Sequence, residues 1–299
     1  MLGFVVNPTA GNGRGREVWK QVEQALSERC AVYRVRETTG MGEAEELAVE
    51  LIQKEGVTKM IAVGGDGTVH EVINGIQKTG KTCEFGLIAA GSGNDFARGH
   101  GLAHDPMQAM ERILRGDGGK TIDLLRFQQR FAVNAIGAGF DAEVAKNANE
   151  APYKGWLGRL RMGWAAYLLS VLRVVRTYQP CDLTLFVDDN MFRLSKVWLV
   201  AVANIPNYGG GLKICPGAVS DDGEAEICVV NNIGKWSLLT ALPLIFTGSH
   251  GRLSSVCFYR GRNIRIESSV PLKVHADGED AGETPLAIEI APGRQPICG

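Results

Sequence analysis

Short apolar runs alternate with stretches of helical period over roughly the first third of the chain. The apolar runs predict strands at residues 3–7, 31–36, 59–63, 84–89 and 120–127. Between the first two runs, Val18, Val22 and Leu26 recur at helical spacing, which predicts a helix that buries one face. Strands that alternate with helices are typical of a doubly wound α/β domain around a parallel sheet.

The pattern of apolar and polar residues changes after Asp123. Strand-like segments then dominate, at residues 131–136, 183–188, 195–203, 224–230, 255–259, 263–267 and 272–276. Two helices interrupt them, at residues 153–177 and 236–246. This pattern predicts an α/β domain at residues 1–125 and a mainly antiparallel β domain at residues 126–285.

The composition is that of an ordinary globular protein, with 45% hydrophobic and 22% charged residues among 299. The net charge of -1 gives no indication of a nucleic-acid partner. The seven cysteines are scattered and form no C-x-x-C pair, so we expect free thiols in a reducing cytosol. We expect no secretion signal, and no apolar run reaches the ~18 residues that a membrane-spanning helix requires.

The most informative motif is Gly64-Gly65-Asp66-Gly67-Thr68, which lies between a strand-like run and a helix-like stretch. Glycines allow backbone N–H groups to approach phosphate oxygens, and the start of the helix adds partial positive charge. A carboxylate beside phosphates is repelled unless a divalent cation lies between them. The motif therefore predicts a nucleotide site at which Asp66 handles a metal ion.

A second loop repeats this arrangement at Gly91-Ser92-Gly93-Asn94-Asp95, again after an apolar run. Ligands of open parallel sheets bind outside the carboxyl ends of the strands, where two such loops can face one crevice. Either loop alone could be an ordinary connection with a capping side chain. Together they favour a phosphate site.

These two loops, with Asn7-Pro8-Thr9-Ala10-Gly11 and Asp277-Gly278-Glu279, resemble the diacylglycerol kinase catalytic family. This family comprises soluble bacterial lipid kinases that are related to sphingosine kinases. The resemblance implies an α/β domain like those of NAD kinases and phosphofructokinases, followed by an antiparallel β domain. It also implies that the last strand, within residues 286–299, returns to complete the first domain.

The resemblance implies ATP and magnesium as cofactors. The nucleotide contacts would come from the backbone and side chains of residues in the first domain, namely Asn7, Thr9, Thr38, Gly64, Gly65, Asp66, Gly67, Thr68, Ser92 and Asn94. Thr38 has an alternative role as part of a cap for the helix that follows at Glu43. Asp66, Asp95 and Glu279 are the carboxylates expected around catalytic magnesium, mostly through waters. Asp123 either joins that network or is a surface or linker carboxylate.

In the resembling kinases, the residue at the position of Asp277 accepts the proton of the lipid hydroxyl. From the residues alone, Asp277-Gly278 is a good hairpin turn, and His275 looks structural because no partner is visible. A further acidic turn at residues 219–224 corresponds to a structural metal site of the family. Its ligands there would be the Asp222 side chain and the carbonyls of Val219 and Glu224.

Between Glu150 and Asp182 the chain carries no acidic residue, while five basic residues alternate with apolar and aromatic ones. A helix of this kind either lies on an anionic membrane or packs one side on the β domain, and the two are compatible. The stretch around Tyr208 is another candidate wall of a lipid site.

The sequence therefore predicts a cytoplasmic, peripherally membrane-associated kinase that transfers the γ-phosphoryl of ATP to a lipid hydroxyl, with diacylglycerol as the expected substrate. No nucleic acid and no transmembrane segment are expected, and a homodimer is left open. Two alternatives remain, a nucleotide kinase of the NAD kinase type and a catalytically inactive protein that binds nucleotide or lipid.

Overall fold

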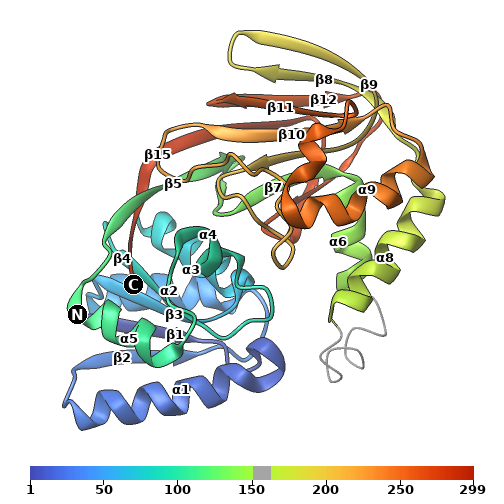
Figure 1. The fold of residues 1–299 in the computed structure, drawn as a ribbon. Helices are drawn as coiled ribbons and strands as arrows, with labels where there is room; N and C mark the ends of the chain where they lie inside the picture. The colour runs from blue at the N-terminus through green and yellow to red at the C-terminus, as the bar shows by residue number, and fades with distance from the viewer. Residues whose placement is uncertain (151–162) are drawn as a thin grey trace. The chain divides into compact units, whose positions relative to one another are not determined.

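The computed structural model describes residues 1–150 and 163–299, with side chains at 1–148 and 169–299. The described chain divides into two compact units, Met1–Leu124 with Pro292–Gly299 and Leu125–Ala291. Both ends of the chain belong to the first unit (Figure 1). Two strands, β5 (Lys120–Phe127) and β15 (Leu286–Cys298), run from one unit into the other.

The first unit contains a parallel sheet in the order β15, β4, β3, β1, β2, in which only the end of β15 takes part. Its other strands are β1 (Leu2–Val6), β2 (Tyr33–Glu37), β3 (Lys59–Gly64) and β4 (Glu84–Ala89). Its helices are α1 (Ala10–Glu28), α2 (Glu43–Glu55), α3 (Asp66–Thr79), α4 (Asp95–His100) and α5 (Pro106–Arg115).

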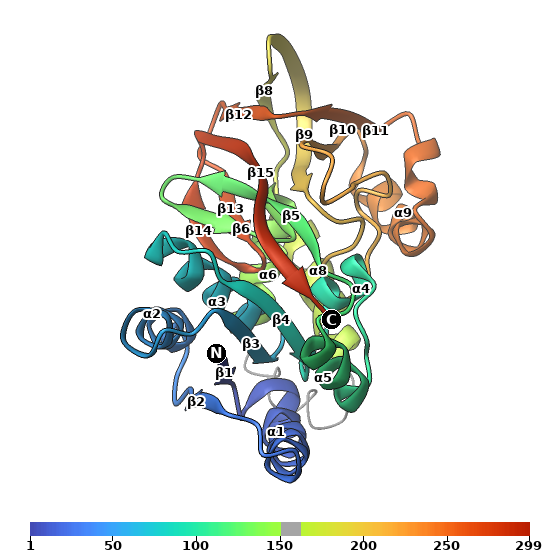
Figure 2. The same cartoon turned by 90° about the vertical axis from the view of Figure 1, so that its left-hand side faces the viewer.

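Helices cover both faces of this sheet. Figure 2 shows α1 and α5 on one side of β1, β3 and β4, and α2 and α3 on the other. Val18, Val22 and Leu26 of α1 lie in the core, as their spacing predicts. Because the central strands are buried on both faces, they appear in the sequence as continuous apolar runs. The predicted doubly wound α/β domain is confirmed.

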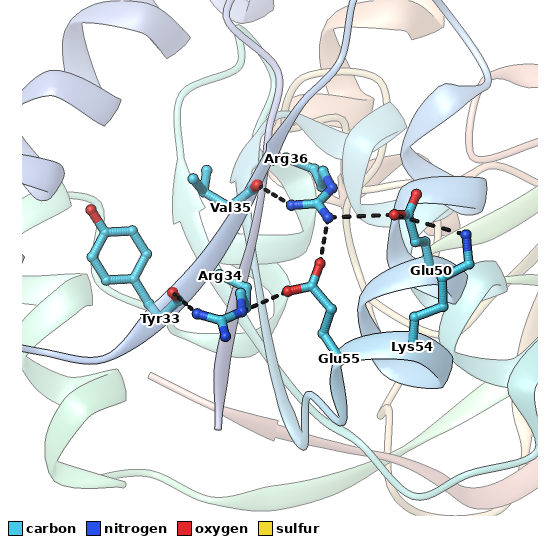
Figure 3. A network of polar contacts seen from close by, with 7 residues as sticks. All are labelled: Tyr33, Arg34, Val35, Arg36, Glu50, Lys54 and Glu55. Atoms are coloured by element: carbon cyan, nitrogen blue, oxygen red, sulfur yellow. Dashed lines mark hydrogen bonds and ion pairs between the residues drawn. The ribbon is translucent and has the colours of Figure 1, made fainter.

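The edge strand β2 is protected by charge. Arg34 contacts Glu55 of α2 at 2.6 Å, and Arg36 contacts both Glu50, at 3.4 Å, and Glu55 (Figure 3). Charged side chains on an edge strand discourage pairing with a second chain. The network also ties β2 to α2.

The second unit is antiparallel in nine pairings of its strands. Beside parts of β5 and β15, its strands are β6 (Arg130–Ala132), β7 (Ala135–Gly139), β8 (Cys181–Val187), β9 (Asn190–Ala203), β10 (Ala225–Asn231), β11 (Val256–Gly261), β12 (Asn263–Ser268), β13 (Lys273–Ala276) and β14 (Glu279–Glu283). The predicted antiparallel β domain is therefore confirmed.

Strands β9 and β10 separate two cores. Val200 and Val202 face a core formed between strands, whereas Ala201 and Ala203 face a core covered by helices. The helices on that side are α6 (Phe140–Glu150), α8 (Gly163–Thr177) and α9 (Lys235–Thr247), and a short 3-10 turn, η1 (Ser249–Arg252), follows α9. Both faces of these strands are therefore buried.

The structure differs from the predicted elements in three places. The segment predicted as one strand at 131–136 is broken between β6 and β7, at Val133 and Asn134. Helix α6 and strand β14 were not predicted. The predicted helix 153–177 is observed from Gly163, and residues 151–162 lie outside the described part of the chain.

A search of the helices among the described residues finds none that is both long and apolar enough to cross a membrane.

Candidate functional site

The two glycine loops of the first unit lie against each other at the carboxyl ends of β3 and β4. Ala90 N–H donates to Gly64 O at 2.7 Å, and Gly91 N–H donates to the same oxygen at 3.2 Å. A Cβ added at Gly91 would lie 2.5 Å from Gly65 Cα, which is closer than real Cβ atoms approach. Glycine is therefore required for the two loops to meet.

The first loop opens α3, with Gly65 as the residue that precedes its first turn. A Cβ at Gly64 would lie 2.4 Å from Thr68 Oγ1, so this glycine leaves space for the threonine side chain. The first N–H groups of a helix have no acceptor within the helix. Gly67 and Thr68 lie in this first turn, where such N–H groups can meet an anion.

The loop after β1 joins the same edge of the sheet. Asn7 Nδ2 donates to Thr68 Oγ1 at 3.3 Å, and the N–H and the hydroxyl of Thr9 donate to Asn7 Oδ1 at 3.1 and 2.9 Å. Gly11 has a φ of 57°, and a Cβ there would lie 2.2 Å from Ala90 O. The structure therefore brings the ends of three neighbouring strands together, with their predicted site residues.

Thr38 lies at the end of β2, with its N–H donating to Val6 O at 2.8 Å, and its side chain is buried. The contact with Glu43 is made instead by Thr39, whose N–H donates to the Glu43 carboxylate at 2.7 Å. Hydrogen bonds from Thr39 lower the pKa of the Glu43 carboxyl. Of the two threonines, Thr39 is the one that contacts the helix start.

The second loop is closed by Asn94, which has a φ of 52°. Its side chain accepts from Gly91 N–H and donates to Gly91 O, both at 3.0 Å. Ser92 is exposed in the same loop. The loop is thus held by its own backbone while it presents a hydroxyl outward.

The three predicted site carboxylates of the first unit have protein partners. Asp66 Oδ1 accepts from Phe96 N–H at 2.9 Å, so this residue links the first loop to α4. Asp95 is 4% exposed and contacts Arg98 at 2.5 Å. Asp123 is 2% exposed and accepts from Gly293 N–H at 2.6 Å, which holds the returning β15. The alternative that Asp123 is a surface carboxylate is therefore wrong.

Among the residues that the structure describes, no three His, Cys, Asp or Glu side chains come together as a metal cluster. The oxygen donors of Asp66 and Asp95 nevertheless suit Mg²⁺, which keeps several waters and needs only one or two protein carboxylates. The residues present therefore fit a water-mediated magnesium site of the predicted kind.

In the second unit, Asp277 and Gly278 form the two-residue turn between β13 and β14, with φ values of 52° and 92°. Two successive positive φ values define the type I′ turn that favours hairpins. The Asp277 carboxylate accepts N–H groups from Val133, Asn134 and Ala135 at 2.8, 2.8 and 3.0 Å. These bonds explain the break between β6 and β7, because the N–H groups there bond to a side chain.

Asp277 therefore has a structural role in addition to any catalytic one. Glu279 begins β14 and is exposed.

A cluster that sequence reasoning missed lies beside this turn. His275 Nε2 contacts Asp141 Oδ2 at 3.3 Å, and the Tyr208 hydroxyl donates to the same oxygen at 2.8 Å. His275 Nδ1 accepts Gly278 N–H at 3.3 Å, which assigns the ring proton to Nε2. A Cβ at Gly137 would lie 2.1 Å from Asp141 Oδ2, so this glycine leaves room for the cluster.

The sequence does contain a signal for Asp141. Gly139-Phe140-Asp141 lies where β7 runs into α6, and this is the same order of strand, glycine, aspartate and helix as at Asp66. The sequence did not reveal the partner of His275, because Asp141 is 134 residues away along the chain.

At the acidic turn predicted as a structural metal site, an arginine lies beside the carboxylates. Asp222 accepts Glu224 N–H at 3.1 Å and forms an ion pair with Arg260 of β11, which also lies 3.8 Å from Glu224. Val219 is 45% exposed. Arg260 thus supplies one positive charge to Asp222, and the structural metal site at this turn stays a prediction.

Comparison with known proteins gives a family for both units. A model described as "Diacylglycerol kinase catalytic domain" matches residues 1–127, and one described as "YegS C-terminal NAD kinase beta sandwich-like domain" matches residues 134–298.

Individual relatives agree with these models. The chain is 33% identical to "Putative lipid kinase YtlR" of Bacillus subtilis over 97% of its length and 96% of that protein. It is 30% identical to a diacylglycerol kinase of Mycobacterium tuberculosis, over 84% of this chain and 79% of that one.

Solved structures support the fold. The crystal structure of "a putative diacylglycerol kinase from Bacillus anthracis" superposes with a TM-score of 0.77 and 23% identity, over 99% of this chain and 96% of that one. The resemblance read from the motifs is confirmed, and the chain belongs to the diacylglycerol kinase catalytic-domain family.

Proposed function

We propose that the protein transfers the γ-phosphoryl group of ATP to the hydroxyl of a lipid, with diacylglycerol as the substrate and phosphatidate as the product. One observation carries the proposal: the two glycine loops meet backbone to backbone at Gly65 and Gly91, beside Asn7 and Thr68. Such an arrangement suits a triphosphate, because glycine backbones and a helix start present N–H groups to phosphate oxygens. The family and the names of the relatives favour a lipid alcohol as acceptor.

Each part of the first unit has a task in this proposal. The backbone of Gly64, Gly65 and Gly67 and the side chains of Thr68 and Ser92 would hold the phosphates. Asp66 and Asp95 would hold magnesium through waters, with Asp123 behind them. Magnesium supplies charge neutralisation for phosphoryl transfer when it is bound. Catalysis would otherwise rest on positioning, as is general for kinases.

We propose Asp277 as the group that accepts the proton of the lipid hydroxyl, with Glu279 beside it. Three backbone N–H groups fix the orientation of the Asp277 carboxylate, which has about four acceptor positions in all. His275, held by Asp141 and Tyr208, fixes the turn through Gly278 N–H. These three are positioning residues in this account.

The test is phosphate transfer from labelled ATP, with magnesium, to a panel of acceptors in mixed micelles. The panel contains diacylglycerol, phosphatidylglycerol, ceramide and a sphingoid base, with NAD as the acceptor of the alternative nucleotide kinase. We expect transfer to diacylglycerol to exceed transfer to every other acceptor. Transfer to NAD alone would replace the proposal by the nucleotide kinase, and no transfer to any acceptor would favour the inactive binding protein.

We further propose that this reaction takes place at the cytoplasmic surface of a membrane, where the lipid resides. The basic helix predicted at 153–177 favours this location, and its described part, α8, exposes Arg173 and Arg176.

A further inference from the structure

Helix α9 has an outward face without charge. Trp236, Ser237, Thr240, Pro243, Phe246 and Thr247 are its exposed residues. Trp236 is 83% exposed and Phe246 is 62% exposed. The outward side of a surface helix normally carries charged residues, as α2 does with its exposed Glu46 and Lys54. Helix α9 departs from this rule.

The inward side of α9 is apolar. Leu238 is its buried residue, and Leu239, Leu242 and Ile245 pack partly against the helix-covered core of the second unit. The outward side mixes hydroxyl groups with Trp236, Pro243 and Phe246, and large aromatic side chains on a helix are normally buried. Here one side packs on the protein, while the other presents a tryptophan and a phenylalanine outward.

The end of α8 continues this surface. Leu169 and Leu172 are 49% and 38% exposed, and Arg173 and Arg176 are exposed beside them on the same side of the helix. Lys235 Nζ, at the start of α9, donates to Arg176 O at 2.9 Å, which joins the two helices (Figure 1). We define the α8/α9 face as Leu172, Arg173, Arg176, Lys235, Trp236 and Phe246.

The two segments that form this face carry charge of one sign. The sequence contains no Asp or Glu from residue 151 to 181 and none from 227 to 266, which are the segments that contain α8 and α9. A hollow of 360 Å³ along α9, between Asn232 and Ser255, is lined by uncharged residues alone. The basic side chains complement an anionic surface, because no acidic residue is near them in sequence. The apolar and aromatic side chains beside them complement an apolar interior beneath that surface.

We propose that the α8/α9 face docks on the surface of an anionic lipid bilayer, with Trp236 and Phe246 inserted at the level of the headgroups. Tryptophan is enriched at that level because its ring is apolar and its N–H is polar. Arg173, Arg176 and Lys235 attract the anionic headgroups. The inference rests on the proposed function in one respect, because a lipid substrate gives a reason for docking.

The test is co-sedimentation of the full chain with vesicles of phosphatidylglycerol and phosphatidylcholine, compared with vesicles of phosphatidylcholine alone. Wild type should partition at least tenfold more strongly onto the anionic vesicles. Trp236→Ser with Phe246→Ser should lower that partitioning at least tenfold. Arg173→Gln should lower it less, and only on anionic vesicles.

The matched control replaces two exposed apolar residues elsewhere, Met41→Ser with Met191→Ser, which are 88% and 52% exposed. This control should partition as wild type does. Equal partitioning of the Trp236/Phe246 variant and wild type would overturn the proposal. It would also be overturned if wild type bound no vesicles, or if sedimentation velocity showed a dimer that the variant abolishes, which would make the face an interface between two copies.

Phosphate transfer to a short-chain diacylglycerol, dissolved below its micelle concentration, separates this proposal from the kinase proposal. The Trp236/Phe246 variant should keep the wild-type rate on this soluble substrate. Should neither protein transfer phosphate while the variant still loses vesicle binding, the docking face would stand and the kinase proposal would fail.

Discussion

The two regions that carry the proposed chemistry are assembled over very different distances along the chain. In the first unit, Asp66 reaches Phe96, which is 30 residues away. In the second, Asp277 reaches Val133 and His275 reaches Asp141, over 144 and 134 residues. The phosphate loops are therefore a property of neighbouring strands, whereas the acidic turn depends on closure of the whole β domain. Substitutions in the two regions should therefore have different effects on nucleotide binding, catalysis and stability.

The largest effect is expected for Asp277→Asn. Loss of a proton acceptor typically costs about 10²- to 10⁴-fold in kcat. The unfolding free energy should also fall by about 1–3 kcal/mol, because the amide side chain cannot accept all three backbone N–H groups. Steady-state kinetics, ATP titration and thermal unfolding check this, and the ATP affinity should stay near that of wild type.

The control for this variant is Ile227→Val in β10, which destabilises a core by about 0.5–1.5 kcal/mol without touching the turn. A near-normal kcat of Asp277→Asn would contradict the proposal that Asp277 accepts the proton of the lipid hydroxyl.

Gly91→Val tests the first unit. The added side chain would meet Gly65 Cα and part the two loops, so ATP affinity and kcat should both fall by about 10²-fold. The matched control is Gly119→Val, since a Cβ there meets nothing within 4 Å. Calorimetric titration with ATP and magnesium measures the effect. If the two variants bound ATP with equal affinity, the proposal that both loops together bind the phosphates would be contradicted.

Tyr208→Phe and Asp141→Asn test the positioning cluster. Tyr208→Phe removes the hydrogen bond that holds Asp141, and Asp141→Asn removes the charge that His275 contacts. In each case kcat should fall by about tenfold, since a hydrogen bond to a charged group contributes about 1.5–3 kcal/mol. A double-mutant cycle should show coupling, because the two residues share one contact. If both single variants lost stability but kept the wild-type kcat, the cluster would have only a structural role.

Acid should destabilise the first unit through His100. Burial lowers the pKa of His100 from 6.5 to about 3, so the unfolded chain takes up its proton first as the pH falls. The contribution of neutral His100 to the unfolding free energy is complete above pH 6.5. Below that pH it declines by at most about 1.4 kcal/mol per pH unit. His100→Phe should flatten this dependence in denaturant unfolding between pH 7 and 5. An unchanged slope would contradict the assignment.

The smallest effect concerns the acidic turn at Asp222. Since Arg260 already supplies the positive charge, a chelator should leave the melting temperature of wild type unchanged. Arg260→Ala should lower the unfolding free energy by about 0.2–1 kcal/mol, the range of exposed ion pairs. A marked loss of stability of wild type on chelation would instead support the metal site that the family resemblance implied.

Prediction from the sequence succeeded where contacts are local. Parallel strands buried on both faces appear as apolar runs, and the glycine loops at Gly64 and Gly91 follow them directly. The same local pattern located the carboxylates of the first unit. It could not reveal that Asp66 contacts Phe96, because that bond depends on how two loops pack.

The second unit shows what the sequence could not supply. The break at Val133 is caused by a carboxylate far along the chain, so no local pattern marks it. His275 contacts Asp141 of α6, which the Tyr208 hydroxyl holds in turn, and neither residue is near His275 in sequence. Arg260 opposite Asp222 depends on the register of β10 and β11. Such long-range pairing is visible only in the folded chain.

The most direct test of the central claim is a crystal structure of the protein with a non-hydrolysable ATP analogue and magnesium. We predict phosphate oxygens at about 2.7–3.2 Å from backbone N–H groups of both loops, those at Gly65 to Thr68 and those at Gly91 to Asn94. A triphosphate bound elsewhere, or held by only one of the loops, would contradict it.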